Sequence, residues 1–285
     1  MSKVRFDISL SLDGFMAGPD QSVENPVGVG GMAVFEWMFP LAAFAVLQGR
    51  EGGEVNASTP VVEERFEGVG AYIMGRNMFG GGHGPWPEDP PWNGWWGDDP
   101  PYHTPVFVLT HHARGPQPMA GGTTFNFVTD GVESALEQAR VAAGDKDVVI
   151  AGGAATVRQY LAAGHVDELN ISLTPSVLGS GERPFEDLPD LRLEQVRVVE
   201  APGVTHLQYR LPDDQTARGT PLRSNCADVA ELVDAHGSGP CERKLVEVQV
   251  LSSASRAACR QSAAGGFFVS ATPLQAPWQS LQRLH

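Results

Sequence analysis

The glycine pair Gly152-Gly153 is the feature of the sequence that most directly suggests chemistry. It lies between a short β-branched run, Val148 to Ile150, and a helical pattern that begins immediately after it. Two adjacent glycines remove side chains where a ligand could approach the backbone closely. The start of the next helix offers unpaired N–H groups and a positive dipole end, which suit a phosphate. The pattern therefore indicates either a phosphate-binding turn or a tight strand-to-helix turn without a ligand.

Other residues able to do chemistry come directly after predicted strands. They are Ser11, Asp13, Gly14, Gly75, Arg76, Asn77, Thr110, His111, His112 and Arg114. Ligands of open α/β sheets bind outside the carboxyl ends of the strands. A guanidinium group, as in Arg76 or Arg114, can hold a phosphate through two parallel hydrogen bonds. Each arginine alone could be a solvated loop charge, but their joint placement at strand ends favours an anion-binding edge.

The elements that must position these residues alternate between strands and helices. The predicted strands cover residues 4–10, 71–74, 106–109, 125–128, 148–150, 168–173, 191–199 and 206–211. The predicted helices cover residues 33–47, with Pro40 disturbing the pattern, a segment opened by Thr59 as N-cap and Pro60, residues 132–143, and the segment after Gly153. This alternation predicts an α/β fold with a mostly parallel sheet, covered on both faces, and an antiparallel edge late in the chain.

Composition limits the classes of protein. A chain of 285 residues, 42% of them hydrophobic, can bury a core in one or two domains. A net charge of −14 argues against non-specific binding to nucleic acid. No apolar run reaches the roughly 18 residues of a membrane span, and the first residues lack the apolar segment of a secretory signal. We therefore expect a cytoplasmic protein with no nucleic-acid or membrane partner.

The last part of the chain differs from the rest. All three cysteines come after residue 220, so residues 1–216 have no cysteine nucleophile, disulfide or cysteine metal cluster. The segment ADVAELVDAHGSGPCERKLVEVQVLSSAS resembles the peptide read when an open frame runs through a tRNA gene. We expect residues 217–285 to be a disordered tail without function. A small accessory segment is the alternative.

Several motifs, in this order, resemble the dihydrofolate reductase-like superfamily: ISLSLDGFMAG, YIMGRNMF, FVLTHH, VIAGGAATVRQYL and DELNISLTPSVLGSGERPFED. They are most similar to the branch that includes the reductase domain of bacterial riboflavin biosynthesis. The resemblance covers about residues 3–211 and implies a three-layer sandwich with a mostly parallel central sheet and an antiparallel C-terminal edge. It also implies NADPH as cofactor and hydride transfer to a small planar pterin- or pyrimidine-like substrate. A non-catalytic nucleotide-binding module of the same fold is the alternative.

The resemblance further assigns roles to single residues. The glycine pair and the helix start would hold the pyrophosphate, the Gly-Arg turn the adenosine-side phosphates, and the strand end with Arg114 the ribose and its 2′-phosphate. Ala17 would border the nicotinamide. The implied cofactor-binding residues are Ala17, Gly75, Arg76, Asn77, Thr110, His111, Arg114, Gly152, Gly153, Ala154, Ala155 and Thr156.

Two carboxylates are candidates for catalysis. Asp13 lies in the loop that borders the nicotinamide in the family, and Glu36 is the only carboxylate in the predicted helix 33–47. Glu36 would serve as the substrate-side carboxylate, with a solvated surface residue as the alternative. No metal is expected, because no ligand spacing for one is present.

The loop at residues 77–103 carries four tryptophans, at positions 86, 92, 95 and 96. So many indole rings in a glycine- and proline-rich loop are not expected to face solvent without a purpose. The loop could be a lid over a flat substrate, a self-packed loop, or a contact between the two subunits of a homodimer.

Overall fold

A computed structural model describes residues 2–22, 24–80, 82, 84–87 and 92–212 of the chain. The predicted tail at residues 217–285 lies outside the described residues. No helix in the described ranges is both long enough and apolar enough to cross a membrane.

One nine-stranded sheet organises the described part of the chain, in the order β4-β5-β3-β2-β6-β1-β7-β9-β8. The strands are β1 (Val4–Leu10), β2 (Val69–Gly75), β3 (Pro105–Leu109), β4 (Gln117–Pro118), β5 (Thr124–Val128), β6 (Asp147–Gly152), β7 (Glu168–Leu173), β8 (Glu194–Ala201) and β9 (Val204–Arg210). The neighbours from β5 to β7 pair in parallel. Strand β4 at one edge and the β9-β8 hairpin at the other pair antiparallel. The predicted mostly parallel sheet with an antiparallel C-terminal edge is confirmed.

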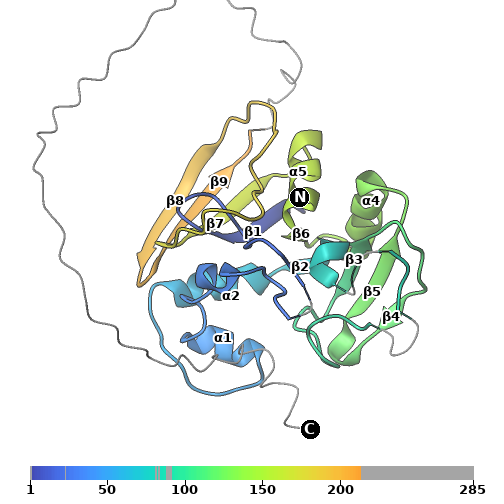
Figure 1. The fold of residues 1–285 in the computed structure, drawn as a ribbon, viewed down its shortest axis with the longest axis horizontal. Helices are drawn as coiled ribbons and strands as arrows, with labels where there is room; N and C mark the ends of the chain where they lie inside the picture. Colours follow the sequence, from blue (N-terminus) through green and yellow to red (C-terminus); the bar gives the residue numbers. More distant parts are fainter. Residues whose placement is uncertain (1, 23, 81, 83, 88–91, 213–285) are drawn as a thin grey trace, which may run out of the picture. The chain divides into compact units, whose positions relative to one another are not determined.

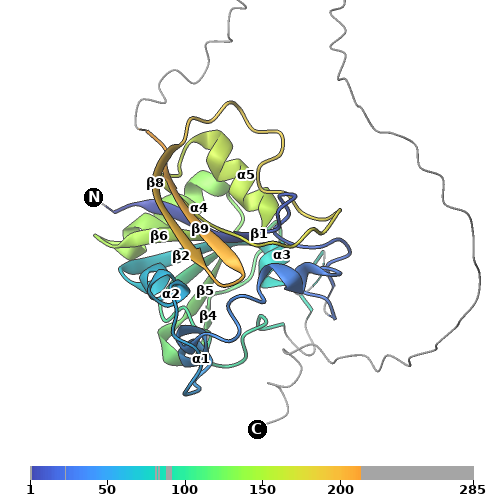
Figure 2. The same cartoon turned by 90° about the vertical axis from the view of Figure 1, so that its left-hand side faces the viewer.

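Helices cover both faces of this sheet and make three layers (Figure 1 and Figure 2). Helices α4 and α5 lie on one face, and α1 and α2 lie on the other. The helices are α1 (Ala42–Leu47), α2 (Ser58–Phe66), α3 (Arg76–Phe79), α4 (Val132–Ala143) and α5 (Ala154–Ala163), with short 3-10 turns at Gly31–Val34 and Ala120–Gly122. The predicted α/β class and three-layer architecture are therefore confirmed.

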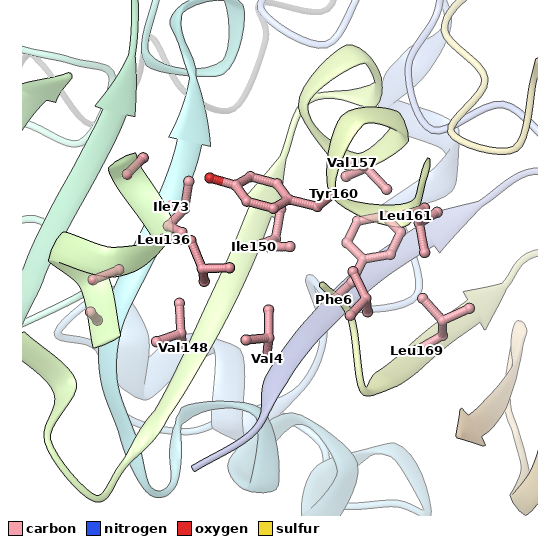
Figure 3. Packing of buried hydrophobic residues seen from close by; sticks show 14 of the residues in the cluster. Val4, Phe6, Ile73, Leu136, Val148, Ile150, Val157, Tyr160, Leu161 and Leu169 are labelled. Carbon is pink, nitrogen blue, oxygen red and sulfur yellow. The ribbon is translucent and has the colours of Figure 1, made fainter. Parts of the chain in front are cut away.

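The largest core fills the space between the sheet and helices α4 and α5 (Figure 3). Phe6 of β1, Ile150 of β6 and Leu161 of α5 are fully buried there. Tyr160 is also buried, and its hydroxyl donates to the Val132 carbonyl at 2.8 Å, so the one polar atom of this ring is satisfied. This packing fixes α5, and with it the glycine pair at its start, against the sheet.

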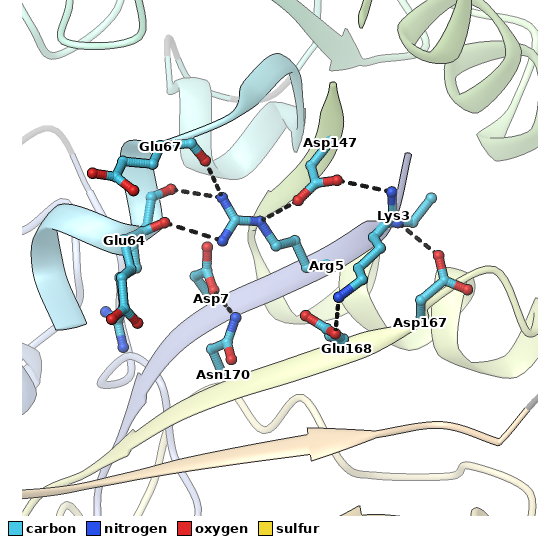
Figure 4. A network of polar contacts seen from close by, with 11 residues as sticks. Lys3, Arg5, Asp7, Glu64, Glu67, Asp147, Asp167, Glu168 and Asn170 are labelled. Atoms are coloured by element: carbon cyan, nitrogen blue, oxygen red, sulfur yellow. Dashed lines mark hydrogen bonds and ion pairs between the residues drawn. The ribbon is translucent and has the colours of Figure 1, made fainter. Parts of the chain in front are cut away.

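A polar network holds helix α2 on the opposite face, near the amino ends of the strands (Figure 4). The Arg5 guanidinium donates to the carbonyls of Glu64, Arg65 and Glu67 at 3.3, 3.0 and 3.3 Å. Its Nε lies 3.4 Å from an Asp147 carboxylate oxygen. The last carbonyls of a helix have no partner within the helix, so a buried cation at this place both satisfies and stabilises them.

The prediction of one helix over residues 33–47 is wrong. The chain forms a 3-10 turn at Gly31–Val34 and further turns, and only α1 is helical. The Trp37 side chain is buried on the sheet, and its Nε1 donates to Ser9 Oγ at 3.2 Å. Burial of a large ring here holds the chain to the sheet, and Pro40 prevents a regular helix through the segment.

The predicted N-cap is also wrong, since α2 begins at Ser58 and Thr59 lies inside it. Asn56 satisfies the helix start instead, because its Oδ1 accepts from the Ser58 N–H at 2.8 Å. The short strand β4 was not predicted, because two residues carry no periodicity.

Deleting residues 219–285 is expected to leave the fold and the cofactor affinity unchanged. Leu211 is buried, and its N–H donates to the Asp167 carbonyl at 2.9 Å, so the chain is fastened to the core at a residue that the deletion keeps. Chain ends tolerate truncation when their backbone is not part of the core. Thermal melting of the full and shortened chains checks this, and a shortened chain that melts several degrees lower would contradict it.

Candidate functional site

The carboxyl ends of β2 and β6 bring the predicted glycines together. Met74 of β2 is in register with Gly152 of β6. A Cβ atom on Gly75 would lie 2.3 Å from Thr156 Oγ1 and 3.8 Å from Gly153 N. A side chain at position 75 would therefore clash with Thr156 in the first turn of α5.

The two glycines of the pair differ in backbone conformation. Gly152 has φ 134°, a conformation that side chains rarely adopt, and its peptide bond to Gly153 is cis. Gly153 has φ −75°, which any residue adopts, and a Cβ there would meet no atom within 4 Å. Neither this φ nor contact with non-neighbouring residues requires a glycine at position 153, so a side chain there would fill the open space before α5.

That space lies at the first turn of α5, which runs from Ala154 through Ala155 and Thr156. The helix has no side-chain cap and no acidic residue in its first turn. Its first N–H groups and positive dipole end therefore have no protein anion beside them in this turn, which is the arrangement that accepts a phosphate. The residues predicted for the pyrophosphate thus lie together at the start of α5, and their pyrophosphate role stays a prediction.

Two arginines gather beside this edge, around the ring of Trp86. The Cζ atom of Arg76 lies 3.1 Å from the ring centroid and that of Arg114 lies 5.3 Å from it. The indole N–H donates to the His112 carbonyl at 2.8 Å, which fixes the ring. Burial lowers the pKa of both arginines, and the Arg114 charge lowers the pKa of Arg76 further. Two guanidinium groups thus lie together at the ends of β2 and β3, with the Trp86 ring beside both.

The remaining predicted residues of this edge differ in their exposure to solvent. Thr110 is buried, and its Oγ1 accepts from the His112 N–H at 3.2 Å, so it shapes the turn after β3. His111 and Asn77 are exposed. Their side chains are free to meet a ligand at the surface, and their cofactor roles stay predictions.

The first loop is fastened to the loop after β7. The Met16 N–H donates to the Glu182 carbonyl at 2.9 Å, and the Glu182 N–H donates to the Ala17 carbonyl at 3.0 Å. Ala17 is buried in this bridge. The segment predicted to border the nicotinamide is therefore held in place by the backbone of a second loop.

Asp13 completes that fastening. Its carboxylate accepts from Ser11 Oγ at 2.6 Å and from the N–H groups of Leu178 and Gly179 at 3.1 and 2.7 Å. The Ser11 hydrogen bond, with help from the two backbone N–H groups, lowers the pKa of Asp13 to about 2. An ionised carboxylate with three donors does not suit proton donation at neutral pH, so the geometry favours a positioning role. A direct catalytic role of Asp13 stays a prediction.

Glu36 is not on a helix, contrary to the predicted element that would have positioned it. It lies on a turn with its side chain exposed, whereas its neighbour Trp37 points to the sheet. Its role as a substrate-side carboxylate therefore has no geometric support beyond its presence in this segment.

The tryptophan-rich loop packs on its own surroundings. The indole N–H of Trp92 donates to the Phe79 carbonyl at 2.8 Å, and that of Trp95 donates to the Met78 carbonyl at 3.0 Å. Trp96 stacks on Phe125 with ring centroids 6.0 Å apart. These contacts favour the self-packed interpretation over a lid, and a subunit contact stays an untested expectation.

A buried polar chain on the α2 face was not foreseen. His206 Nε2 lies 2.8 Å from Ser58 Oγ, and its Nδ1 lies 2.7 Å from Ser172 Oγ, which accepts from Arg65 at 2.7 Å. Burial and the charges of Arg65 and Arg197 lower the pKa of His206 to about 4. The sequence signal was the polar alternation on two central strands, formed by Asp7, Ser9, Asn170 and Ser172.

The comparisons with known proteins agree with this architecture. Residues 2–207 match the sequence model of the RibD C-terminal domain. The chain belongs to this family. The resemblance read from the motifs is thereby confirmed for the RibD branch, and the matched range ends inside β9. No curated protein matches the chain.

Solved structures that resemble the chain are distant in sequence. A protein named for riboflavin biosynthesis from Shewanella sp. PV-4 is 22% identical with a TM-score of 0.48, over 74% of this chain and 99% of its own. A pyrimidine reductase-like protein from Corynebacterium diphtheriae is 13% identical with a TM-score of 0.44, over 75% and 93%. A dihydrofolate reductase from Enterococcus faecalis, solved with NADP(H), is 12% identical with a TM-score of 0.40, over 74% and 97%.

Metal-ligating side chains do not gather at this site. Within the ranges that the structure describes, no group of three or more His, Cys, Asp or Glu could hold a metal ion.

Proposed function

We propose that the chain is an NADPH-dependent reductase that transfers a hydride to a small planar pterin- or pyrimidine-like compound. The observation that carries this proposal is the open space at Gly153, before the uncapped first turn of α5 and beside Gly75. Membership of the RibD C-terminal domain family supports an oxidoreductase. When bound, NADPH supplies the hydride, and the protein supplies binding and orientation.

In this proposal the first N–H groups of α5 bind the pyrophosphate. Arg76 and Arg114 bind the phosphates on the adenosine side, with Thr110 and His111 at the ribose. The first loop, with Ala17 held by the loop after β7, borders the nicotinamide.

A nucleotide-binding module without turnover is the second candidate. It is favoured by the state of the two candidate acids, since Glu36 is exposed on a turn and Asp13 is engaged by three donors. The rate of NADPH oxidation with a panel of pterins and pyrimidines separates the two. Acceleration by any of them supports the reductase, and binding without acceleration by any supports the module.

The chain is expected to bind NADPH at least tenfold more tightly than NADH. Tenfold corresponds to about 1.4 kcal/mol, and one hydrogen bond to a charged group contributes about 1.5–3 kcal/mol, so one guanidinium contact to the 2′-phosphate suffices. Calorimetric titration of both cofactors measures the ratio.

Arg114→Gln is expected to remove most of that preference, and Arg140→Gln on α4 is the matched control, because Arg140 is exposed on the helix of the opposite layer. Equal affinity of the unchanged protein for NADPH and NADH would contradict the assignment of these arginines.

A further inference from the structure

A pocket lies between α2 and the hairpin edge of the sheet, away from the glycine pair. Arg65 and Glu64 line it from the last turn of α2. From the strands, Asn170, Gln208 and Arg197 line it and follow one another in register across β7, β9 and β8. Helix and strands thus place two guanidinium groups around one space that opens on the α2 face.

Arg65 is the unusual group of this pocket. One of its terminal nitrogens donates to Ser172 Oγ at 2.7 Å, and its Cζ lies 5.7 Å from the Trp37 ring centroid. Its Nε is shielded from solvent and has no hydrogen-bond partner in the described ranges. Within the same ranges no carboxylate forms an ion pair with it. Arg65 is part-buried, and a charge partly shielded from water is stabilised by an ion pair, so an anion in this pocket would stabilise it.

No neighbouring carboxylate in the described ranges forms an ion pair with Arg65. Burial lowers the pKa of Arg65, and the charge of Asp7, whose carboxylate accepts from Asn170 at 2.6 Å, offsets only part of that lowering. Arg5 also lines the pocket, but its guanidinium is engaged by the end of α2 and by Asp147.

His206 adds no positive charge. Burial and the two nearby arginines hold its pKa at about 4, so the ring is neutral at pH 7. Arg65 therefore remains a part-buried cation that forms no ion pair within the described ranges.

Arg197 provides a second cation that can be released. It pairs with Glu64 at 2.7 Å, and the two side chains are 42% and 53% exposed. An ion pair this exposed contributes little to stability, so a ligand anion can replace the Glu64 carboxylate at small cost.

We propose that this pocket binds an oxyanion group, a carboxylate or a phosphate, with the part-buried Arg65 as its inner cation and Arg197 as its outer one. Guanidinium groups match both oxyanions through paired hydrogen bonds. The proposal does not rest on cofactor binding, because its residues lie on α2 and the hairpin rather than at the start of α5.

Calorimetric titration of the full chain, free of cofactor and in a buffer without competing anions, tests this with inorganic phosphate and with benzoate. At least one probe is expected to bind saturably to one site. Arg65→Gln is expected to weaken that binding at least tenfold, and Arg140→Gln, on the opposite layer, to leave it unchanged. Binding of phosphate alone identifies a phosphate-bearing ligand, and binding of benzoate alone identifies a carboxylate.

Glu64→Gln provides a variant that does not disturb the buried side of the pocket, since the Glu64 carboxylate is half-exposed. It frees Arg197 and is expected to tighten probe binding severalfold.

The proposal is overturned if neither probe binds, or if folded Arg65→Gln binds as tightly as the unchanged protein. Should Arg65→Gln fail to fold by circular dichroism, unchanged or weaker binding in Glu64→Gln overturns it instead. NADPH titration of the same proteins reports on the proposed function separately, because Arg65→Gln should bind NADPH normally.

Discussion

A Gly153→Val variant is expected to fold normally and to lose detectable NADPH binding. The native φ of −75° at this position is open to any residue, and a Cβ meets no atom of a non-neighbouring residue within 4 Å, so neither φ nor packing opposes the side chain. A valine would instead occupy the space before the first turn of α5, where the pyrophosphate has to approach the N–H groups. Fluorescence titration with NADPH measures the loss, and circular dichroism and thermal melting verify the fold.

Ala162→Val is the matched control for this variant. It places the same valine side chain at an exposed position near the other end of the same helix. The control should bind NADPH as the unchanged protein does. If folded Gly153→Val also binds NADPH normally, the glycine pair is only a turn between β6 and α5, and the proposed cofactor site is incorrect.

The sequence predicted best where one periodic pattern decides the structure. The bounds of β1, α4 and β7 agree with prediction, because their apolar residues recur at the strand or helix period and their ends are marked by glycine or polar residues. The helix predicted over residues 33–47 was wrong because contacts with distant residues hold this segment. Trp37 packs against Ser9 and His206, which lie on β1 and β9. Apolar content alone does not distinguish a helix from turns held down by such contacts.

The residues of the candidate site also differ in how far local sequence patterns predict them. Glycines and arginines at strand ends could be assigned from the sequence, because parallel strands bring their carboxyl ends to one edge. The clamp of Asp13 on Leu178 and Gly179 joins loops that are 165 residues apart, and no local pattern encodes it. The chain from Ser58 to Arg65 through His206 likewise depends on how α2 lies over β7 and β9, which only the assembled fold determines.

The free energy of unfolding is expected to fall by about 3 kcal/mol between pH 6.5 and pH 4 because of His206. Its pKa in the folded protein is about 4, against an ordinary value of 6.5, and the side chain is buried at 4% exposure. Between these two values the unfolded chain binds a proton that the folded chain does not, so stability rises with pH across this range and is lost as pH decreases through it. The size follows from about 1.4 kcal/mol per pKa unit over the difference.

Urea denaturation at pH 7 and pH 5 measures this effect, with His206→Gln as the test variant. About 2 kcal/mol of the histidine contribution is lost over that interval in the unchanged protein. Glutamine cannot take up the proton, so the stability of the variant should change with pH by about that much less. The variant should also be less stable at pH 7, because glutamine cannot reproduce the contacts of His206 with Ser58 and Ser172. His111→Gln changes an exposed histidine and should keep the full pH dependence. An equal pH dependence in His206→Gln and the unchanged protein would show that the ring is not held neutral.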